Sequence, residues 1–152
     1  MYVLDTNTLI YYFKGQGQVA QNLANVSAQE ICVPTIVLFE LQVGIAKSAF
    51  PVKRTQQLQQ LLSRVNLVPF DRDAAFAAAT IRAQLEQQGT PIGQIDVLIA
   101  GATVALQATL VTHNINEFSR VSGLSIADWY WLIVMGWGHS DRICFPSQGQ
   151  PL

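Results

Sequence analysis

Short apolar runs alternate along the chain with longer segments in which apolar residues recur at helical spacing. The short runs are bounded by turn-forming residues, which is typical of buried strands. We expect strands at 1–4, 31–33, 65–69, 108–112 and 124–126. The intervening segments predict helices at 8–13, 18–25, 35–48, 53–63, 71–88 and 95–106, with a turn or short helix at 114–118. This alternation predicts an α/β fold whose parallel sheet of about five strands is covered by helices on both faces.

The alternation stops near residue 129, where the character of the sequence changes. An apolar cluster is followed there by Gly-Trp-Gly-His and then by Pro-Ser-Gln-Gly-Gln-Pro. We therefore expect one domain over 1–129 and an atypical C-terminal extension over 130–152. The apolar run of the extension could pair as an edge strand, lie in a dimer interface or form an irregular end.

Composition places the chain among globular proteins, because 50% of its 152 residues are hydrophobic and only 12% are charged. The formal net charge is −1, from nine Lys and Arg against ten Asp and Glu. This balance argues against a protein that holds nucleic acid by bulk charge. It leaves room for a nuclease in which a bound metal ion supplies the local positive charge.

The two cysteines, Cys32 and Cys144, lie far apart and form no C-x-x-C pair, so neither a disulfide framework nor a zinc site is indicated. No signal peptide is visible at the N-terminus. The longest apolar run, 129–138, is about half of what a membrane helix needs. We expect a soluble, cytoplasmic protein without a membrane segment.

Three acidic residues stand out by their position. Asp5 directly follows the first strand, and ligands of open parallel sheets bind beyond the carboxyl ends of the strands. Glu40 and Asp96 lie in helices that are otherwise almost uncharged. A carboxylate on an apolar helical face is costly unless it is paired, protonated or bound to metal. Oxygen-only ligation suits Mg²⁺ or Mn²⁺, which would polarise a phosphodiester and activate a water molecule.

Each acid also has a purely structural interpretation. Asp5 could be the N-cap of a helix, Asp96 could stabilise a helix N-terminus, and Glu40 could face solvent. Taken one at a time, these interpretations are at least as good as the functional one. The combination of all three acids favours a metal site.

Four stretches, in order and at natural spacing, resemble the motifs of PIN domains. They are Val-Leu-Asp-Thr-Asn-Thr-Leu-Ile at 3–10, Phe-Glu-Leu-Gln-Val-Gly at 39–44, Ile-Asp-Val-Leu-Ile-Ala at 95–100 and Val-Thr-His-Asn-Ile-Asn-Glu-Phe at 111–118. The ending Arg-Val-Ser-Gly-Leu at 120–124 and the pair Asp128-Trp129 are similar to those of VapC toxins. The resemblance covers residues 1 to about 129.

The resemblance implies a three-layer α/β/α sandwich and a Mg²⁺-dependent endoribonuclease of toxin–antitoxin systems, with Mn²⁺ as a possible substitute. By this resemblance Asp5, Glu40 and Asp96 are both catalytic and metal-binding. Transfer RNA or another structured RNA is the implied substrate. A VapB-type antitoxin and a second copy of the chain, forming a homodimer, are the implied partners.

The fourth acidic position of the motif departs from the pattern, because Asn114 stands where Asp is usual. Asn occurs there in VapC-like chains, so we count Asn114 among the catalytic residues. An amide offers a carbonyl oxygen but no charge, so we expect weaker metal binding without RNA. Glu117 could compensate through a water molecule or be a solvated surface acid.

The remaining candidates each keep two interpretations. Thr6, Asn7 and Thr112 could support the acids or a metal-bound water, or could simply form turns and a strand end. His113 and Arg120 could contact substrate, although a rim histidine and a surface arginine are the ordinary alternatives. Lys47, Lys53 and Arg54 could form a small basic patch beside the site or a solvated face.

Other protein classes fit less well. Phosphatases of the haloacid dehalogenase type need D-x-D after the first strand, and Asn7 stands at the second position. Receiver domains need an acidic pair near the N-terminus and an Asp after the third strand, and this sequence has neither. The remaining rival is a catalytically weak or inactive PIN scaffold that only binds protein or RNA, supported by Asn114 and the odd C-terminal segment.

Overall fold

The computed structural model describes residues 1–131, and the part of the predicted extension from 132 onward lies outside the described residues. Short apolar segments form five strands: β1 (Tyr2–Leu4), β2 (Ile31–Pro34), β3 (Asn66–Val68), β4 (Thr109–Val111) and β5 (Ser125–Ala127). All neighbouring strands pair in parallel, in the order β3-β2-β1-β4-β5. The predicted α/β class and the five-stranded parallel sheet are confirmed.

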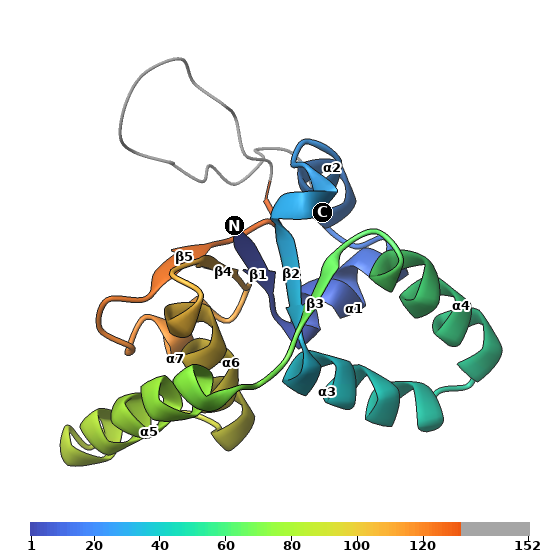
Figure 1. Cartoon of the computed structure of the whole chain (residues 1–152). Helices are drawn as coiled ribbons and strands as arrows, with labels where there is room; N and C mark the ends of the chain where they lie inside the picture. Colours follow the sequence, from blue (N-terminus) through green and yellow to red (C-terminus); the bar gives the residue numbers. More distant parts are fainter. Residues whose placement is uncertain (132–152) are drawn as a thin grey trace, which may run out of the picture.

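Helices fill the segments between the strands. They are α1 (Thr6–Lys14), α2 (Val19–Ala24), the short 3₁₀ helix η1 (Ala28–Glu30), α3 (Thr35–Ala46), α4 (Pro51–Leu62), α5 (Arg72–Gln87), α6 (Gln94–Ala105) and α7 (Ile115–Phe118). In Figure 1, α1 to α4 gather on one side of the molecule, and α5 to α7 lie on the other side. Right-handed crossovers explain this division, since the chain moves from β1 outward to β3 and then returns to β4 and β5.

The strand order reverses at β1, the central strand, because the chain adds β2 and β3 on one side of it and then β4 and β5 on the other. Leu4 is paired with Val111, and the backbone N–H of Asp5 donates to the carbonyl of Val111 at 3.1 Å. In open α/β sheets the crevice outside the carboxyl ends of the strands at such a reversal is the usual ligand site. The residues after β1 and β4 therefore meet where this fold offers a site.

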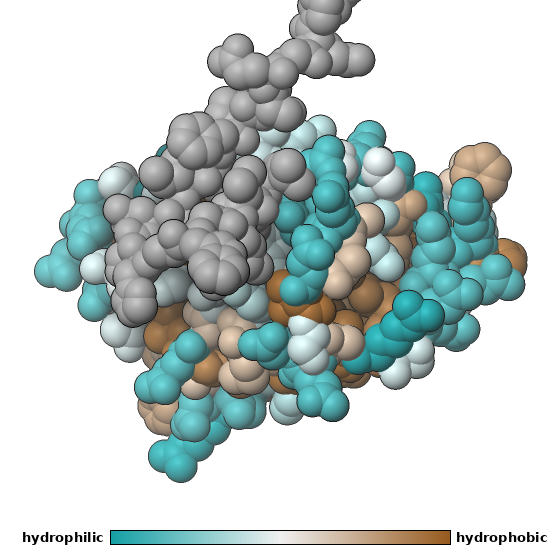
Figure 2. Space-filling view, turned by 90° about the horizontal axis from the view of Figure 1, so that it is seen from above, coloured by the Kyte–Doolittle hydropathy of each residue, from teal (hydrophilic) through white to brown (hydrophobic). Residues whose placement is uncertain are grey.

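The core lies between the sheet and the helices that cover it. Trp129 and Phe118 are its largest fully buried side chains, and Trp129 packs against Tyr2 with ring centroids 5.1 Å apart. Trp129, at the end of the predicted domain, is therefore part of the core. Some apolar surface stays exposed between polar side chains on the face seen from above (Figure 2).

Helices α5 and α6 pack unusually closely at one point. A Cβ added to Gly101 would lie 2.5 Å from Cβ of Ala78 and 2.6 Å from its backbone nitrogen. Only a glycine on α6 and a small residue on α5 allow the two backbones to approach this far. This contact holds the helix that carries Asp96 against its neighbour.

Several boundaries differ from the predictions for local reasons. Helix α4 begins at Pro51 rather than at the predicted residue 53, because a proline in the first turn of a helix loses no hydrogen bond. Strand β2 runs to Pro34 rather than ending at the predicted residue 33, and α3 follows at Thr35. The 3₁₀ helix at 28–30 was not predicted.

The described chain continues in contact with the domain for two residues beyond 129. Nδ2 of Asn22 donates to the carbonyls of Trp129 and Trp131 at 3.0 and 2.8 Å. The carbonyl of Tyr130 accepts from the N–H of Gln18 at 2.9 Å, and the Tyr130 ring lies against Gly17. Among residues 1–131 no helix is both long and apolar enough to cross a membrane.

Candidate active site

Asp5 is buried at the point where β1 ends and α1 begins. Its Oδ1 accepts from the backbone N–H of Thr8 at 2.7 Å, and its Oδ2 accepts from Oγ1 of Thr112 at 2.5 Å. Burial raises the pKa of Asp5 above its ordinary value of 3.8; the bonds from Thr112 and Thr8 oppose the rise, and the Glu40 carboxylate adds to it. The N-cap interpretation of Asp5 is thus confirmed, and the same side chain faces a second acid.

Glu40 lies half-buried on α3, and its Oε2 accepts a hydrogen bond from Oγ1 of Thr6. Thr6 is the first residue of α1, so this bond joins α1 to α3 beside Asp5. Thr6, which was predicted to support the acids, therefore contacts the Glu40 carboxylate directly.

Asp96 lies in the first turn of α6 and has no hydrogen bond to another residue in the described part of the chain. Burial, followed by the charges of Asp5, Glu40 and Glu117, raises its pKa from 3.8 to about 6. A Cβ at Gly93, the N-cap of α6, would lie 3.2 Å from Oδ2 of Asp96. Gly93 thus leaves the space that this carboxylate occupies.

The electrostatic coupling shows that the four acids share one region, although they lie as far apart as 5 and 117 in the sequence. Within residues 1–131, however, no three His, Cys, Asp or Glu side chains stand in an arrangement that would hold a metal ion. The donor set itself is all oxygen and strongly anionic, which suits a hard divalent cation. Its chemistry fits such an ion, while its side chains would have to move to enclose one.

Thr112 is fully buried and holds two elements of the site together. Besides donating to Asp5, its Oγ1 accepts from the backbone N–H of Asn114 at 3.0 Å. Asn114 is the N-cap of α7, but its side chain makes no capping bond. Its amide is therefore not committed to the helix that follows.

Glu117, the predicted helper, is half-buried on α7 and contributes to the raised pKa of Asp96. Arg120 lies 3.7 Å from Oε1 of Glu117, and its Nη1 donates to the carbonyl of Pro91 at 3.0 Å. The guanidinium of Arg120 thus bridges α7 and the loop before α6.

One of the predicted supporting residues, Asn7, makes no contact with the acids. The side chain of Asn7 is exposed and forms no hydrogen bond within the described chain, so Thr8 and Thr112 are the residues that orient Asp5. Sequence reasoning missed Thr8, although an N-cap Asp ordinarily accepts from the N–H three residues later.

His113 belongs to an aromatic cluster instead of standing alone at the rim. Its ring stacks on Tyr130 with centroids 4.4 Å apart, and Tyr11 and Trp131 lie edge-on at 5.8 and 6.0 Å. Its Nδ1 lies 2.9 Å from Oδ2 of Asp128. These contacts fix the end of β4 against the segment after β5.

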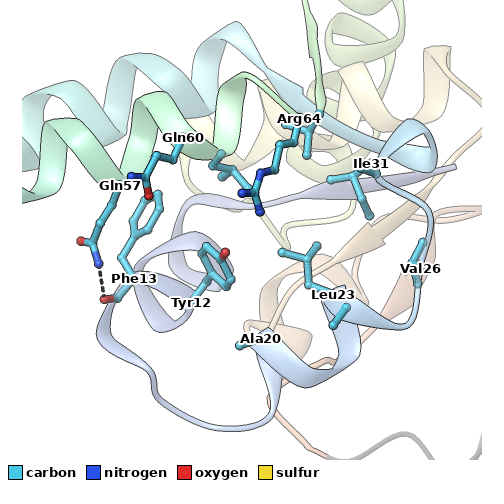
Figure 3. A pocket seen from close by; sticks show the side chains of 13 residues that line it. Tyr12, Phe13, Ala20, Leu23, Val26, Ile31, Gln57, Gln60 and Arg64 are labelled. Carbon is cyan, nitrogen blue, oxygen red and sulfur yellow. Dashed lines mark hydrogen bonds between the residues drawn. The ribbon is translucent and has the colours of Figure 1, made fainter.

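A cavity of about 510 Å³ lies away from the acids, between α1, α2 and α4. Tyr12, Leu23 and Arg64 border it, and Nε2 of Gln57 donates across its edge to the carbonyl of Phe13 at 3.2 Å (Figure 3). No acidic side chain lines this cavity. It is therefore not the candidate active site.

Comparison with known proteins assigns the fold and the motifs to one family. The sequence model of the PIN-domain family matches residues 2–124 of this chain. The chain belongs to the PIN-domain family. This confirms the resemblance that the four motifs indicated.

The relatives of this PIN domain include VapC proteins. It is 34% identical over 128 residues to the tRNA(fMet)-specific endonuclease VapC of Salmonella typhimurium, covering 84% of this chain and 97% of the relative. It is 37% identical over 131 residues to ribonuclease VapC2 of Rickettsia felis, covering 85% and 98%. The solved structure of VapBC2 from Rickettsia felis, bound to a DNA fragment from their promoter, superimposes with a TM-score of 0.79, covering 84% of this chain and 98% of that one.

Proposed function

We propose that this PIN domain is a divalent-metal-dependent endoribonuclease of the VapC kind, with Asp5, Glu40 and Asp96 as the ligands of Mg²⁺ or Mn²⁺. The observation that carries the proposal is the cluster of carboxylates at the β1/β4 reversal, where burial and then charge repulsion raise the pKa of Asp96 to about 6. Such a cluster is unfavourable unless protons or a cation neutralise it. The ribonuclease names of relatives at 34–37% identity support the same activity.

The three proposed metal ligands differ in how firmly hydrogen bonds orient them. Asp5 is oriented by Thr8 and Thr112, and Glu40 is oriented by Thr6. Asp96 has no such partner, so its carboxylate is the one most easily turned toward a cation. A divalent ion bound there would polarise the phosphodiester and lower the pKa of an attacking water.

The substrate class we propose is tRNA or another structured RNA. The relative from Salmonella typhimurium is named for tRNA(fMet), and it aligns with 84% of this chain. The partner we propose is a VapB-like antitoxin, because the Rickettsia felis relative was solved as VapBC2. We also propose a homodimer, supported by the exposed Phe39 and Val43, which lie one turn apart on α3.

Cleavage of RNA by the purified protein tests the proposal. Total bacterial tRNA and single-stranded RNA are incubated with Mg²⁺ and with EDTA, and the products are separated on a denaturing gel. Cleavage is expected only with Mg²⁺, and Asp5→Ala and Asp96→Asn are expected to abolish it. Asp73→Asn, an exposed acid on α5, is the matched control and should cleave like the parent.

The rival, an inactive scaffold, is favoured by two observations: Asn114 at the fourth acidic position and the lack of a closed metal site within residues 1–131. The same assay separates the two functions. If the folded parent protein leaves every RNA intact in both Mg²⁺ and Mn²⁺, the ribonuclease proposal is wrong and the inactive scaffold is favoured.

A further inference from the structure

A second cavity, of about 240 Å³, lies between α1, α3 and α4 and has Glu40 in its wall. Ile10 of α1 and Leu41 of α3 contribute apolar surface to the same wall. Because Glu40 accepts a hydrogen bond from Thr6, the residue that follows Asp5, this cavity lies beside the candidate active site. Whatever occupies it would lie next to the reacting phosphodiester.

Two cationic side chains border this cavity, and neither is paired with a carboxylate in the described part of the chain. Lys14 is exposed in the last turn of α1, and neither Lys14 nor Arg54 forms an ion pair within residues 1–131. Nη1 of Arg54 donates to the carbonyl of Phe13 at 2.8 Å and to Oε1 of Gln57 at 2.7 Å. These bonds fix the guanidinium in place and leave its other N–H groups available to an anion.

Gly44 supplies an independent observation. It lies in the interior of α3, where glycine is less favourable than alanine by about 1 kcal/mol. A Cβ added to Gly44 would meet nothing within 4 Å, so packing inside the described chain does not require glycine there. Gly44 does line the cavity, and a side chain at this position would project into space that a ligand could use.

We propose that this cavity binds a nucleotide of the RNA substrate adjacent to the cleaved phosphodiester. Lys14 and Arg54 bind its phosphate, the apolar wall contacts its base or sugar, and Gly44 keeps the space open. The inference rests on the proposed ribonuclease function. It explains how a chain with a net charge of −1 can still hold RNA, since the cations needed for phosphate lie at the site itself.

The size of the cavity favours one nucleotide over a longer ligand. Pockets that enclose drug-sized ligands start at about 300 Å³, and this one measures about 240 Å³. The cavity combines an apolar wall with two cationic side chains, Lys14 and Arg54. This combination matches a nucleotide, which has a flat apolar base and an anionic phosphate.

Binding is measured in an Asp96→Asn background, so that RNA is held in Mg²⁺ without being cleaved. The probes are a fluorescein-labelled single-stranded oligoribonucleotide of mixed sequence and labelled total tRNA, followed by fluorescence anisotropy at several salt concentrations. Lys14→Gln is expected to weaken binding of the labelled oligonucleotide by about three- to fivefold. It should also reduce the slope of log Kd against log salt by about 0.7, the value for one lost phosphate contact on a single strand.

Lys53→Gln is the matched charge control, because Lys53 lies on the same helix as Arg54 but outside the cavity. Gly44→Leu tests the space, and Ala46→Leu, an exposed position on α3 that does not line the cavity, controls for the added side chain. Gly44→Leu should weaken binding more than Lys14→Gln does, and both controls should bind like the background protein. Gly44→Ala is a milder second variant if Gly44→Leu melts early in circular dichroism.

Cleavage by the otherwise unaltered protein gives a second readout. Lys14→Gln and Gly44→Leu should raise KM for RNA with little change in kcat, because they alter binding and leave the carboxylates intact. If the parent cleaves RNA but both variants bind and cleave as it does, the nucleotide subsite is wrong and the ribonuclease stands. If the parent neither binds nor cleaves RNA, the proposed function fails and the subsite with it.

Two further outcomes would identify a different occupant of the cavity. If Gly44→Leu and Lys14→Gln weaken binding of a VapB-type antitoxin and leave RNA binding unchanged, the cavity is a protein-binding surface. If Gly44→Leu only changes the oligomeric state in light scattering, the space belongs to a second copy of the chain. Either result overturns the nucleotide proposal.

Discussion

Thr112 donates a hydrogen bond from Oγ1 to Oδ2 of Asp5 at 2.5 Å, across 107 positions of sequence. The bond joins the ends of β1 and β4, the neighbouring parallel strands at which the strand order reverses. Since both residues are buried, the orientation of the Asp5 carboxylate depends on this contact and on the N–H of Thr8.

Replacing Thr112 by valine keeps the shape of the side chain and removes the hydroxyl. A buried acceptor left without its donor costs about 1–3 kcal/mol, so Thr112→Val should lower the free energy of unfolding by that amount. Urea denaturation followed by circular dichroism measures the change. The control is Thr103→Val, because Thr103 is equally buried but donates only to a carbonyl of its own helix, that of Ile99. Equal losses in the two variants would contradict a special role for the Thr112–Asp5 bond.

The raised pKa of Asp96 predicts a pH dependence of the metal-free protein. The folded state holds a proton on Asp96 up to about pH 6, whereas the unfolded chain releases it near 3.8. The stabilising contribution of this group is therefore complete below about pH 4 and is lost as the pH rises through 6. The shift of Asp5 acts in the same direction. In EDTA, the site should destabilise the protein more at pH 7.5 than at pH 5.

Thermal melts of the parent and Asp96→Asn at both pH values check this dependence. In EDTA the variant should melt above the parent by a margin that grows from pH 5 to pH 7.5. Adding Mg²⁺ should raise the melting temperature of the parent at pH 7.5 more than at pH 5 and leave the variant nearly unchanged. A margin that is constant across pH would show that Asp96 does not titrate in this range.

Two glycines in helices predict effects of opposite sign. Gly101→Ala places a methyl group against the backbone of Ala78 and should destabilise the protein by about 1–3 kcal/mol. Gly44→Ala meets open space and should stabilise it by about 0.5–1 kcal/mol, because alanine is the better helix former. Chemical denaturation of the two variants beside the parent measures both. A stabilising Gly101→Ala would show that α5 and α6 can move apart at this contact, and a destabilising Gly44→Ala would show that the space at Gly44 is not open.

The boundary of the domain can be tested by shortening the chain. A chain ending after Trp131 keeps the bonds from Asn22 and Gln18 and the buried Trp129 ring, so it should melt close to the full chain. A chain ending after Asp128 loses that ring and should be less stable by about 3–5 kcal/mol. Differential scanning calorimetry distinguishes the two. A large loss on ending after Trp131 would show that residues 132–152 belong to the folded domain.

The sequence by itself determined the elements and the main acids. Apolar runs of three to four residues at β1 and β2, bounded by polar turns, predict strands because a strand in the middle of a parallel sheet is buried on both faces. Asp5 after β1 is a helix N-cap by local chemistry alone, and the order of the motifs is enough to identify the family. These features depend on neighbours within a few residues.

The tertiary structure decided which distant side chains meet. Nothing local to Thr112 names Asp5 as its partner, and nothing local to His113 predicts that it stacks on Tyr130. Likewise Lys14 and Arg54, 40 positions apart, border one cavity only because α4 packs beside α1. Such contacts follow from the strand order and the packing of helices on the sheet, and these are set by burial summed over the whole chain.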